Sequence, residues 1–151
     1  MSVLDQFKLD DKVAIVTGGA SGLGKAMGKS LAEAGVNLVI ADMNLEVGQE
    51  TAKEFEEATG NKAIACEVDV TNLDQVNAMV KETMDTFGRI DILFNNAGIN
   101  EHVKFEDMPY DRWKKTMDVN LNSMVLVTNA VGEVFRKQQH GVIVNTSSMS
   151  G

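Results

Sequence analysis

Five short apolar segments recur along the chain, at residues 13–16, 38–41, 63–68, 92–94 and 142–144. Each is continuously apolar, whereas a strand with one face in water would alternate apolar and polar residues. Continuous apolar runs of this length are typical of parallel strands that helices cover on both faces. We therefore predict five buried strands at these positions.

The stretches between these segments carry apolar residues at spacings of three and four, as amphipathic helices do. Glycines at positions 35, 60, 88 and 141 favour helix ends, and residues 71–74 offer a capping box for the third helix. The four predicted stripes are Leu23, Met27, Leu31 and Ala34; Val47, Thr51, Phe55 and Ala58; Leu73, Val76, Val80, Met84 and Phe87; and Trp113, Met117, Leu121, Met124, Thr128, Val131 and Phe135.

This alternation of strands and helices predicts an α/β fold with a doubly wound, Rossmann-like parallel sheet, because parallel neighbours need a crossover helix between them. The composition, 44% hydrophobic and 24% charged, suits one globular domain over residues 1–151. We expect this domain to be incomplete, with the sheet truncated after its fifth strand. That strand would then lie at an unprotected edge, and its exposed apolar surface would favour aggregation.

The formal charge of −8 argues against nucleic acid or an anionic membrane as a partner, since both need a basic surface. No signal peptide pattern and no membrane-spanning apolar run occur, so the cytoplasm is the expected location. Cys66 lies in an apolar run and is interpreted as a structural residue. His102 and His140 lack partners at metal-ligand spacing, so no metal site is predicted.

A glycine-rich segment from Thr17 to Gly24 follows the first strand and leads directly into the first helix. Glycines allow the backbone to approach a pyrophosphate closely, and the free N–H groups at the helix start attract an anion. The glycine spacing is G-x-x-x-G-x-G, which differs from the G-x-G-x-x-G of the usual dinucleotide fingerprint. On spacing alone, a simple strand-to-helix turn is the alternative interpretation.

Asp42 ends the second strand, 18 residues beyond Gly24, where a carboxylate could accept hydrogen bonds from an adenosine ribose. A carboxylate repels a 2′-phosphate, and the adjacent Met43 and Asn44 provide no cation to offset that repulsion. We therefore predict NAD rather than NADP as the cofactor. The alternative is that Asp42 only caps the following helix.

Five motifs in one order resemble those of the short-chain dehydrogenase/reductase (SDR) family, and together they span essentially the whole chain. They are Thr17 to Gly24, Asp69-Val70, Asn95 to Gly98, Asp118 to Asn120 and Asn145 to Gly151. The resemblance implies an NAD-dependent oxidoreductase. The chain looks most similar to the family's sugar, polyol and sugar-acid dehydrogenases, of the gluconate or sorbose type.

The resemblance also implies which residues bind the cofactor. Three groups would contact the pyrophosphate, the adenosine and the nicotinamide ribose in turn, while Asn95 would brace the sheet. The groups are Gly18, Ser21, Gly22, Leu23 and Gly24; Asp42, Asp69 and Val70; and Asn96, Ala97 and Gly98.

For catalysis, the resemblance implies Asn120, which would hold a water relay, and Ser148, which stands three positions before Gly151 and would polarise a carbonyl. The family's tyrosine and lysine, Y-x-x-x-K, normally follow this serine, and the sequence ends before that position. Tyr110 and Lys114 have the right spacing but precede Asn120, so we interpret them as a solvated pair on a helix surface. The chain alone is expected to be nearly inactive.

In the parent enzyme we expect hydride transfer between NAD(H) and a secondary alcohol or ketone, with a small-molecule substrate such as a sugar, polyol or sugar acid. Two alternatives stay open: a 3-oxoacyl-thioester reductase, which would favour NADP and suits Asp42 poorly, and an NAD-binding fragment without turnover. His102 follows the fourth-strand motif and could contact substrate, although an exposed loop histidine is the simpler interpretation. The resemblance implies a homotetrameric parent.

Overall fold

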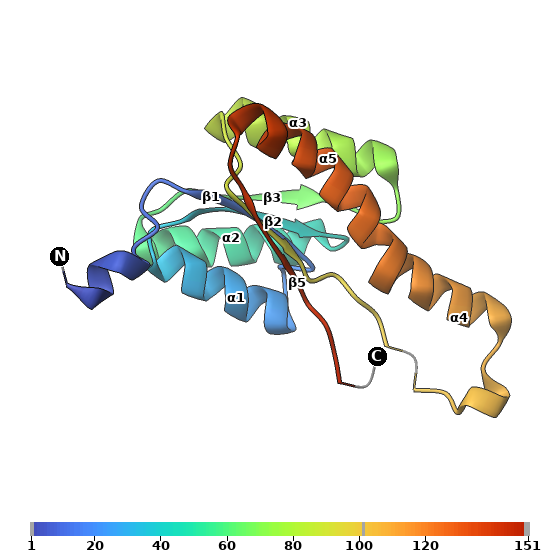
Figure 1. The fold of residues 1–151 in the computed structure, drawn as a ribbon. Coiled ribbons are helices and arrows are strands. Elements are labelled where there is room, and N and C mark those ends of the chain that lie inside the picture. Colours follow the sequence, from blue (N-terminus) through green and yellow to red (C-terminus); the bar gives the residue numbers. More distant parts are fainter. Residues whose placement is uncertain (1, 101, 150–151) are drawn as a thin grey trace.

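A five-stranded parallel sheet forms the centre of the protein in a computed structural model, which describes residues 2–100 and 102–149 (Figure 1). The strand order is β3-β2-β1-β4-β5, and every neighbouring pair is parallel. This order confirms the predicted doubly wound sheet. The strands are β1 (Val13–Thr17), β2 (Asn37–Asp42), β3 (Ala63–Glu67), β4 (Ile92–Asn95) and β5 (Val142–Asn145).

Helices cover both faces of the sheet: α1 and α2 lie on one face, and α3 and α5 lie on the other (Figure 1). No helix in the described part of the chain is long and apolar enough to span a membrane. The helices are α1 (Gly22–Glu33), α2 (Leu45–Thr59), α3 (Leu73–Phe87), α4 (Tyr110–Met117) and α5 (Ser123–Gln138), with short 3-10 turns at Val3–Phe7 and Phe105–Asp107.

The first helix buries a different stripe from the one predicted. Its buried residues are Gly24, Gly28 and Ala32, whereas Leu23 is 67% exposed. Small residues let α1 approach its neighbours closely, since a Cβ added at Gly28 would lie 3.1 Å from a ring carbon of Phe55 in α2. Of the predicted stripe, Leu23 therefore faces solvent, whereas Leu31 is partly buried against the core.

The predicted capping box at the start of α3 was wrong by one residue. Asn72 is the N-cap, and its side chain accepts hydrogen bonds from the N–H groups of Asp74 and Gln75 at 3.1 and 3.2 Å. The Thr71 hydroxyl instead donates to Asp69 at 2.7 Å. Thr71 thus belongs to the loop that follows β3.

The fourth predicted helix is divided by a π-helical turn, Asp118–Asn122, which separates α4 from α5. The predicted stripe held only in part. Leu121 is 53% exposed, whereas Ser123, Val127 and Val131 are buried at spacings of four. A π-helical turn contains more residues than an α-helical turn. Different residues therefore face the core after it than a regular helix would bury.

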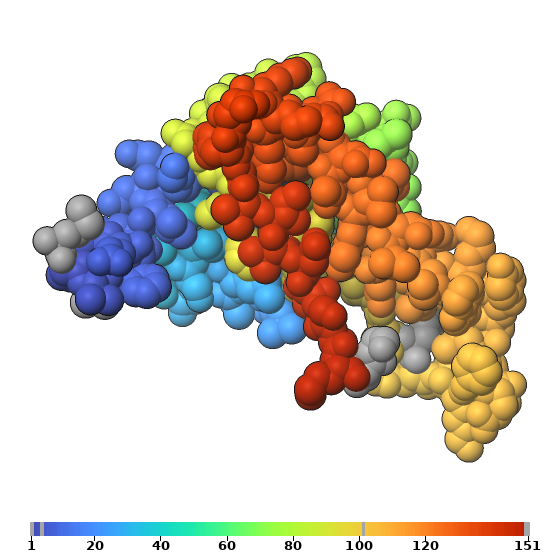
Figure 2. Space-filling view, in the orientation of Figure 1, coloured from blue at the N-terminus to red at the C-terminus, as the bar shows by residue number. Residues whose placement is uncertain are grey.

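Strand β5 lies at the edge of the sheet and pairs only with β4 among the described strands. All four of its residues are exposed, with Val142 at 56%. Figure 2 shows this segment lying uncovered along the surface of the molecule. The position agrees with the predicted unprotected edge.

A buried carboxylate, Asp91, joins three segments at the amino ends of the strands. It accepts hydrogen bonds from the Val13 N–H at 2.9 Å, Arg89 Nε at 2.8 Å and His140 Nε2 at 2.7 Å, and Lys12 Nζ lies 3.6 Å away. Burial opposes its ionisation, but the bonds from Arg89, His140 and Val13 outweigh burial and lower the pKa of Asp91 to about 2. We call these five residues the Asp91 cluster.

Candidate functional site

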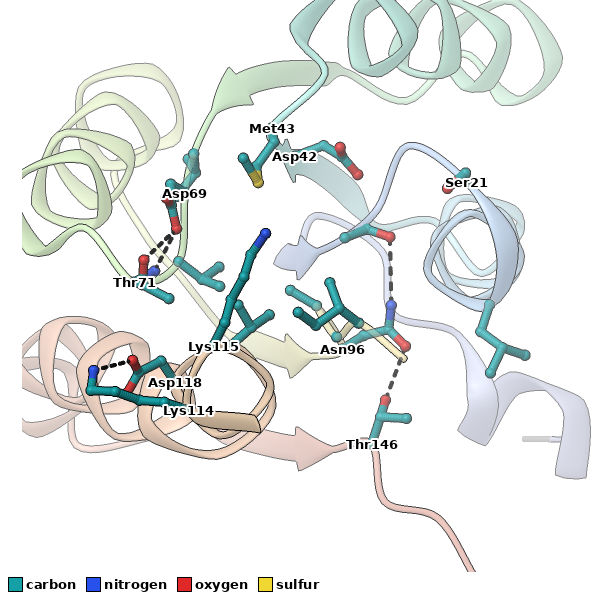
Figure 3. Close-up of a pocket in the computed structure, with 18 of the residues that line it drawn as sticks. Ser21, Asp42, Met43, Asp69, Thr71, Asn96, Lys114, Lys115, Asp118 and Thr146 are labelled. Carbon is teal, nitrogen blue, oxygen red and sulfur yellow. Dashed lines mark hydrogen bonds and ion pairs between the residues drawn. The ribbon is translucent and has the colours of Figure 1, made fainter. Parts of the chain in front are cut away.

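A cleft of about 820 Å³ lies along the carboxyl ends of the strands. The loops after β1, β2, β3 and β4 line it together with α4 and with Thr146, which follows β5 (Figure 3). It lies where the strand order reverses, since the chain runs outward on one side of β1 and returns to pair β4 on the other. Ligands of open α/β sheets bind at such a switch point.

The structure brings most of the predicted cofactor residues together around this cleft. Gly22 and Gly24 do not line it: Gly22 is exposed at the start of α1, and Gly24 is buried beneath the glycine loop. The predicted residues that line it are Gly18, Ser21, Leu23, Asp42, Asp69, Val70, Asn96, Ala97 and Gly98.

The glycine loop is folded tightly against the start of α1 and the loop after β4. Gly18 has a φ of +63°, and a Cβ at this position would lie 3.0 Å from the Ala97 Cα. At Gly24 a Cβ would collide with the Gly18 carbonyl and the Asn96 amide. Gly18 and Gly24 are thus required because backbone segments approach closely at both positions. A simple strand-to-helix turn would not need this close approach.

The amino end of α1 has no side-chain cap. Its N-cap residue, Ser21, makes no capping hydrogen bond, whereas Asn44 and Asn72 cap α2 and α3. The first N–H groups of a helix have no partner within the helix. Those of α1 therefore remain available at the cleft for an anion such as a pyrophosphate, and the residues present fit that group.

Asp42 holds the glycine loop as well as lining the cleft. One carboxylate oxygen accepts from the Ala20 N–H at 3.1 Å, and the other accepts from the Asn44 N–H at 3.0 Å. The cap of α2 is Asn44, whose side chain accepts from the Val47 N–H. Asp42 is therefore not the helix cap, and each of its oxygens keeps a lone pair for a further donor such as a ribose hydroxyl.

Thr17 and Asn96 fix the glycine loop to the loop after β4. The buried Thr17 hydroxyl accepts from the N–H groups of Asn96 and Ala97, both at 3.0 Å. The Asn96 amide group donates to the Thr17 carbonyl at 3.3 Å. Its oxygen accepts from the Thr146 hydroxyl at 3.1 Å (Figure 3). Sequence reasoning did not assign a role to Thr17 or Thr146, although both directly follow or end a strand.

Asn95 points away from the cleft. Its side chain is buried and donates to the Thr128 hydroxyl at 3.0 Å and the Asn145 side chain at 2.9 Å. These bonds join β4 to α5 and β5. The geometry matches the bracing role expected for this residue.

The loop after β3 forms the wall opposite α1. Val70 is buried, and one Asp69 carboxylate oxygen accepts from the Thr71 N–H and hydroxyl at 2.9 and 2.7 Å. The Gln75 side chain accepts from the Asp69 N–H at 2.7 Å. These bonds join the loop to itself and to the first turn of α3.

The α4 wall was missed by sequence reasoning. Asp111, Lys115 and Val119 line the cleft at spacings of four, which is the signal that could have placed them on one helix face. The Lys115 ammonium points into the cleft toward the region of Met43 (Figure 3). Met43 and Asn44 beside Asp42 provide no cation, but Lys115 reaches the cleft from α4 and corrects the expectation that no cation lies nearby.

Tyr110 and Lys114 each have a closer partner than one another. Tyr110 is 75% exposed and stacks on Trp113, with ring centroids 5.9 Å apart. Lys114 contacts Asp118 at 2.8 Å, and this bond raises the pKa of Lys114 and lowers the pKa of Asp118. Both residues lie on the surface of α4 as predicted, and Lys114 also borders the cleft.

The two predicted catalytic residues lie outside the set that lines the cleft. Asn120, in the π-helical turn, accepts from the Ile99 N–H and donates to the Ile99 carbonyl, both at 2.8 Å. It thus holds a loop residue that does line the cleft. Ser148 is exposed beyond β5, and Gly151, the other end of the predicted S-x-x-G turn, lies outside the described residues.

Cys66, His102 and His140 lie outside the residues that line the cleft. Cys66 is buried and its thiol donates to Glu82 at 3.4 Å; burial, followed by the Glu82 charge, raises the pKa of Cys66 to about 12. His140 belongs to the Asp91 cluster, and His102 is exposed. Within residues 2–100 and 102–149, no three His, Cys, Asp or Glu side chains converge as metal ligands would.

Comparison with curated proteins gives relatives that differ in activity. A 3beta-hydroxysteroid dehydrogenase 2 from Eggerthella lenta is 41% identical, with 95% of this chain and 55% of that protein aligned. A 3-oxoacyl-[acyl-carrier-protein] reductase from Synechocystis is 36% identical over 95% of this chain and 58% of that protein. A sorbose reductase from Candida albicans is 37% identical over 99% and 54%. The chain thus spans little more than half the length of these relatives.

Solved structures and a family model agree with these matches. A short-chain dehydrogenase/reductase from Mycobacterium marinum is 36% identical and superposes with a TM-score of 0.95, over 100% of this chain and 61% of that one. The family model described as short chain dehydrogenase matches residues 12–151. The chain therefore belongs to the short-chain dehydrogenase/reductase family.

Proposed function

We propose that this chain provides the NAD-binding part of an oxidoreductase that transfers a hydride between NAD(H) and a secondary alcohol or ketone. The observation that carries the proposal is the uncapped start of α1 at the cleft, with the Asp42 carboxylate on the adjacent strand. The helix N–H groups suit a pyrophosphate, and a carboxylate that accepts hydrogen bonds from hydroxyls suits the neighbouring ribose of a dinucleotide.

In this proposal the chain binds and orients the cofactor. Gly18, Ser21, Gly22, Leu23 and Gly24 would hold the pyrophosphate, Asp42 the adenosine ribose, Asp69 and Val70 the adenine, and Asn96, Ala97 and Gly98 the nicotinamide ribose. When bound, the nicotinamide would supply or accept the hydride.

NAD is preferred over NADP because Asp42 would repel a 2′-phosphate. Lys115 favours NADP instead, since its ammonium enters the cleft from α4 and would attract a 2′-phosphate. However, Lys115 is exposed, whereas Asp42 is fixed by two backbone N–H groups at 3.1 and 3.0 Å. A fixed carboxylate opposes a 2′-phosphate more effectively than a solvated lysine attracts it.

Two residues are proposed to act near the reacting carbon in the whole enzyme. Ser148 would orient the substrate oxygen, and Asn120 would keep the Ile99 loop in place beside the nicotinamide. Tyr110 is not proposed as the proton donor. Its ring stacks on Trp113, and it precedes Ser148 in the chain, whereas the family's tyrosine follows the serine.

For the substrate we propose a sugar, polyol or sugar acid, supported by a sorbose reductase among the relatives. The reductase of acyl-carrier-protein thioesters is the alternative, and Asp42 counts against it if such an enzyme uses NADP. We also propose a homotetrameric, cytoplasmic parent enzyme. Initial rates of the whole enzyme with a panel of polyols, sugar acids and one 3-oxoacyl thioester would distinguish these substrates.

Cofactor titration tests the central proposal. NADH should quench the fluorescence of Trp113, the only tryptophan, and should bind about tenfold more tightly than NADPH. Asp42→Ala should reduce that preference to about twofold or less, because the repelling charge is removed. Asp85→Ala, which changes an exposed carboxylate on α3, is the control and should leave the preference intact. Tighter binding of NADPH by the unchanged protein would refute the assignment.

A further inference from the structure

The hydroxyl of Thr51 in α2 contacts the glycine loop. Thr51 is 1% exposed, and its Oγ1 donates to the Ala20 carbonyl at 3.2 Å. The N–H of the same residue, Ala20, donates to the Asp42 carboxylate at 3.1 Å. Both backbone polar groups of Ala20 are therefore tied, one to the neighbouring helix and one to the carboxylate that lines the cleft.

Two other helical threonines, Thr59 and Thr83, use their hydroxyls differently. The hydroxyls of Thr59 and Thr83 donate to carbonyls four residues earlier in their own helices, at 2.8 Å each. Such local bonds are the usual choice for a threonine within a helix. Thr51 instead reaches from its helix to the loop.

The bond is also needed to satisfy a buried group. Ala20 is 3% exposed, so its carbonyl has little access to water. A buried carbonyl that loses its partner is costly, and a flexible glycine-rich loop can move to find another. Any such movement would carry the Ala20 N–H away from Asp42.

We infer that Thr51 is a positioning residue for cofactor selectivity: it fixes Ala20, and Ala20 in turn fixes the Asp42 carboxylate toward the cleft. The inference rests on the proposed function, because selectivity is meaningful only if the cleft binds a dinucleotide. Thr51 does not line the cleft, so its effect passes entirely through Ala20.

The test compares Thr51→Val, which keeps the shape of the side chain and removes the hydroxyl, with Thr51→Ser, which keeps the hydroxyl. Thr51→Val should raise the dissociation constant for NADH about five- to tenfold. The constant for NADPH should change less, because a loosened Asp42 also repels the 2′-phosphate less. Thr51→Ser should stay within about twofold of the unchanged protein for both ligands.

Thr83→Val is the matched control, since Thr83 is equally buried and its hydroxyl bonds only within α3. It should lower the thermal midpoint without changing the NADH to NADPH ratio. If Thr51→Val does not fold, Thr51→Ala removes the same hydroxyl without adding a methyl against the loop. A ratio unchanged in the folded variant, or changed equally by Thr83→Val, overturns the inference. Failure of the unchanged protein to bind NADH would instead reject the proposed function itself.

Discussion

The two ends of the sheet use polar groups in opposite ways. At the amino ends, the Asp91 cluster surrounds one buried carboxylate with Arg89, Lys12, His140 and a backbone N–H, so its charge is neutralised within the protein. At the carboxyl ends, hydroxyls and amides fix the loops, while the first N–H groups of α1 are left without a side-chain cap.

This difference separates residues that hold the fold from residues that hold a ligand. Removing a charge that is satisfied inside the protein destabilises the fold, because its buried partners are left unpaired, but such a charge offers little to a ligand. Backbone donors left open at a helix start add little stability but create a binding site. Changes at the amino ends should therefore affect stability, and changes at the carboxyl ends should affect binding.

Gly24→Ala should have the largest effect on binding. Its Cβ would collide with the Gly18 carbonyl and the Asn96 amide, so the glycine loop must open. NADH affinity should fall about a hundredfold or more. Gly132→Ala is the control, because Gly132 lies within α5 with open space around its missing Cβ; it should bind NADH normally. Normal binding by Gly24→Ala would contradict the close loop packing.

Asp91→Ala should destabilise the protein by about 2–3 kcal/mol, because it leaves buried Val13 N–H and clustered cations without their acceptor. Denaturant unfolding would measure this loss. Asp85→Ala, which breaks an exposed pair with Lys81, should cost less than about 0.5 kcal/mol. Under conditions where Asp91→Ala is still folded, an NADH affinity more than threefold weaker would break the comparison between the two ends.

The free energy of unfolding should depend on pH in acid because of the same Asp91 cluster. The folded-state pKa of Asp91 is lowered from 3.8 to about 2, so its ionised form stabilises the fold above about pH 4. That contribution, about 2 kcal/mol, should be lost as the pH falls from about 4 to about 2. Denaturant unfolding at several pH values would show the loss, and Asp91→Asn should show a shallower acid dependence. Identical acid curves for the two proteins would argue against the lowered pKa.

Lys115→Met should have the smallest effect. Removing an exposed charge at the cleft should weaken NADPH about threefold and NADH less, and added salt should reduce the difference. Fluorescence titration would measure both constants. Lys81→Met, on the far surface of α3, should change neither ligand. An unchanged NADPH affinity would show that Lys115 stays in solvent.

The sequence predicted most of the cleft because local rules decide it. Continuous apolar runs located the five strands, and the loops after parallel strands meet at one edge of the sheet. Gly18, Asp42, Asp69 and Asn96 each follow or end a strand, so they came together as expected. The order of the elements predicts that these residues share one edge, whereas the resemblance to the SDR family implied that Asp69 and Asn96 contact a cofactor.

The missed features depend on contacts between distant segments. The Asp91 cluster joins Lys12, Arg89 and His140, which no local pattern connects. Lys115 reaches the cleft only because α4 folds across it. The exposure of Leu121 follows from the π-helical turn, which a repeat of 3.6 residues does not represent.

The exposed β5 edge should be visible in the exchange of backbone hydrogens with solvent. The Val142 N–H donates to the carbonyl of Asp91, just before β4, and the Thr146 N–H donates to the carbonyl of Asn95, at the end of β4. Both distances are 2.9 Å. Successive residues of a strand point their N–H groups in opposite directions, so those of Ile143 and Asn145 point away from β4, toward the edge that no described strand pairs with. Within this one strand, slowly and rapidly exchanging amides should therefore alternate residue by residue.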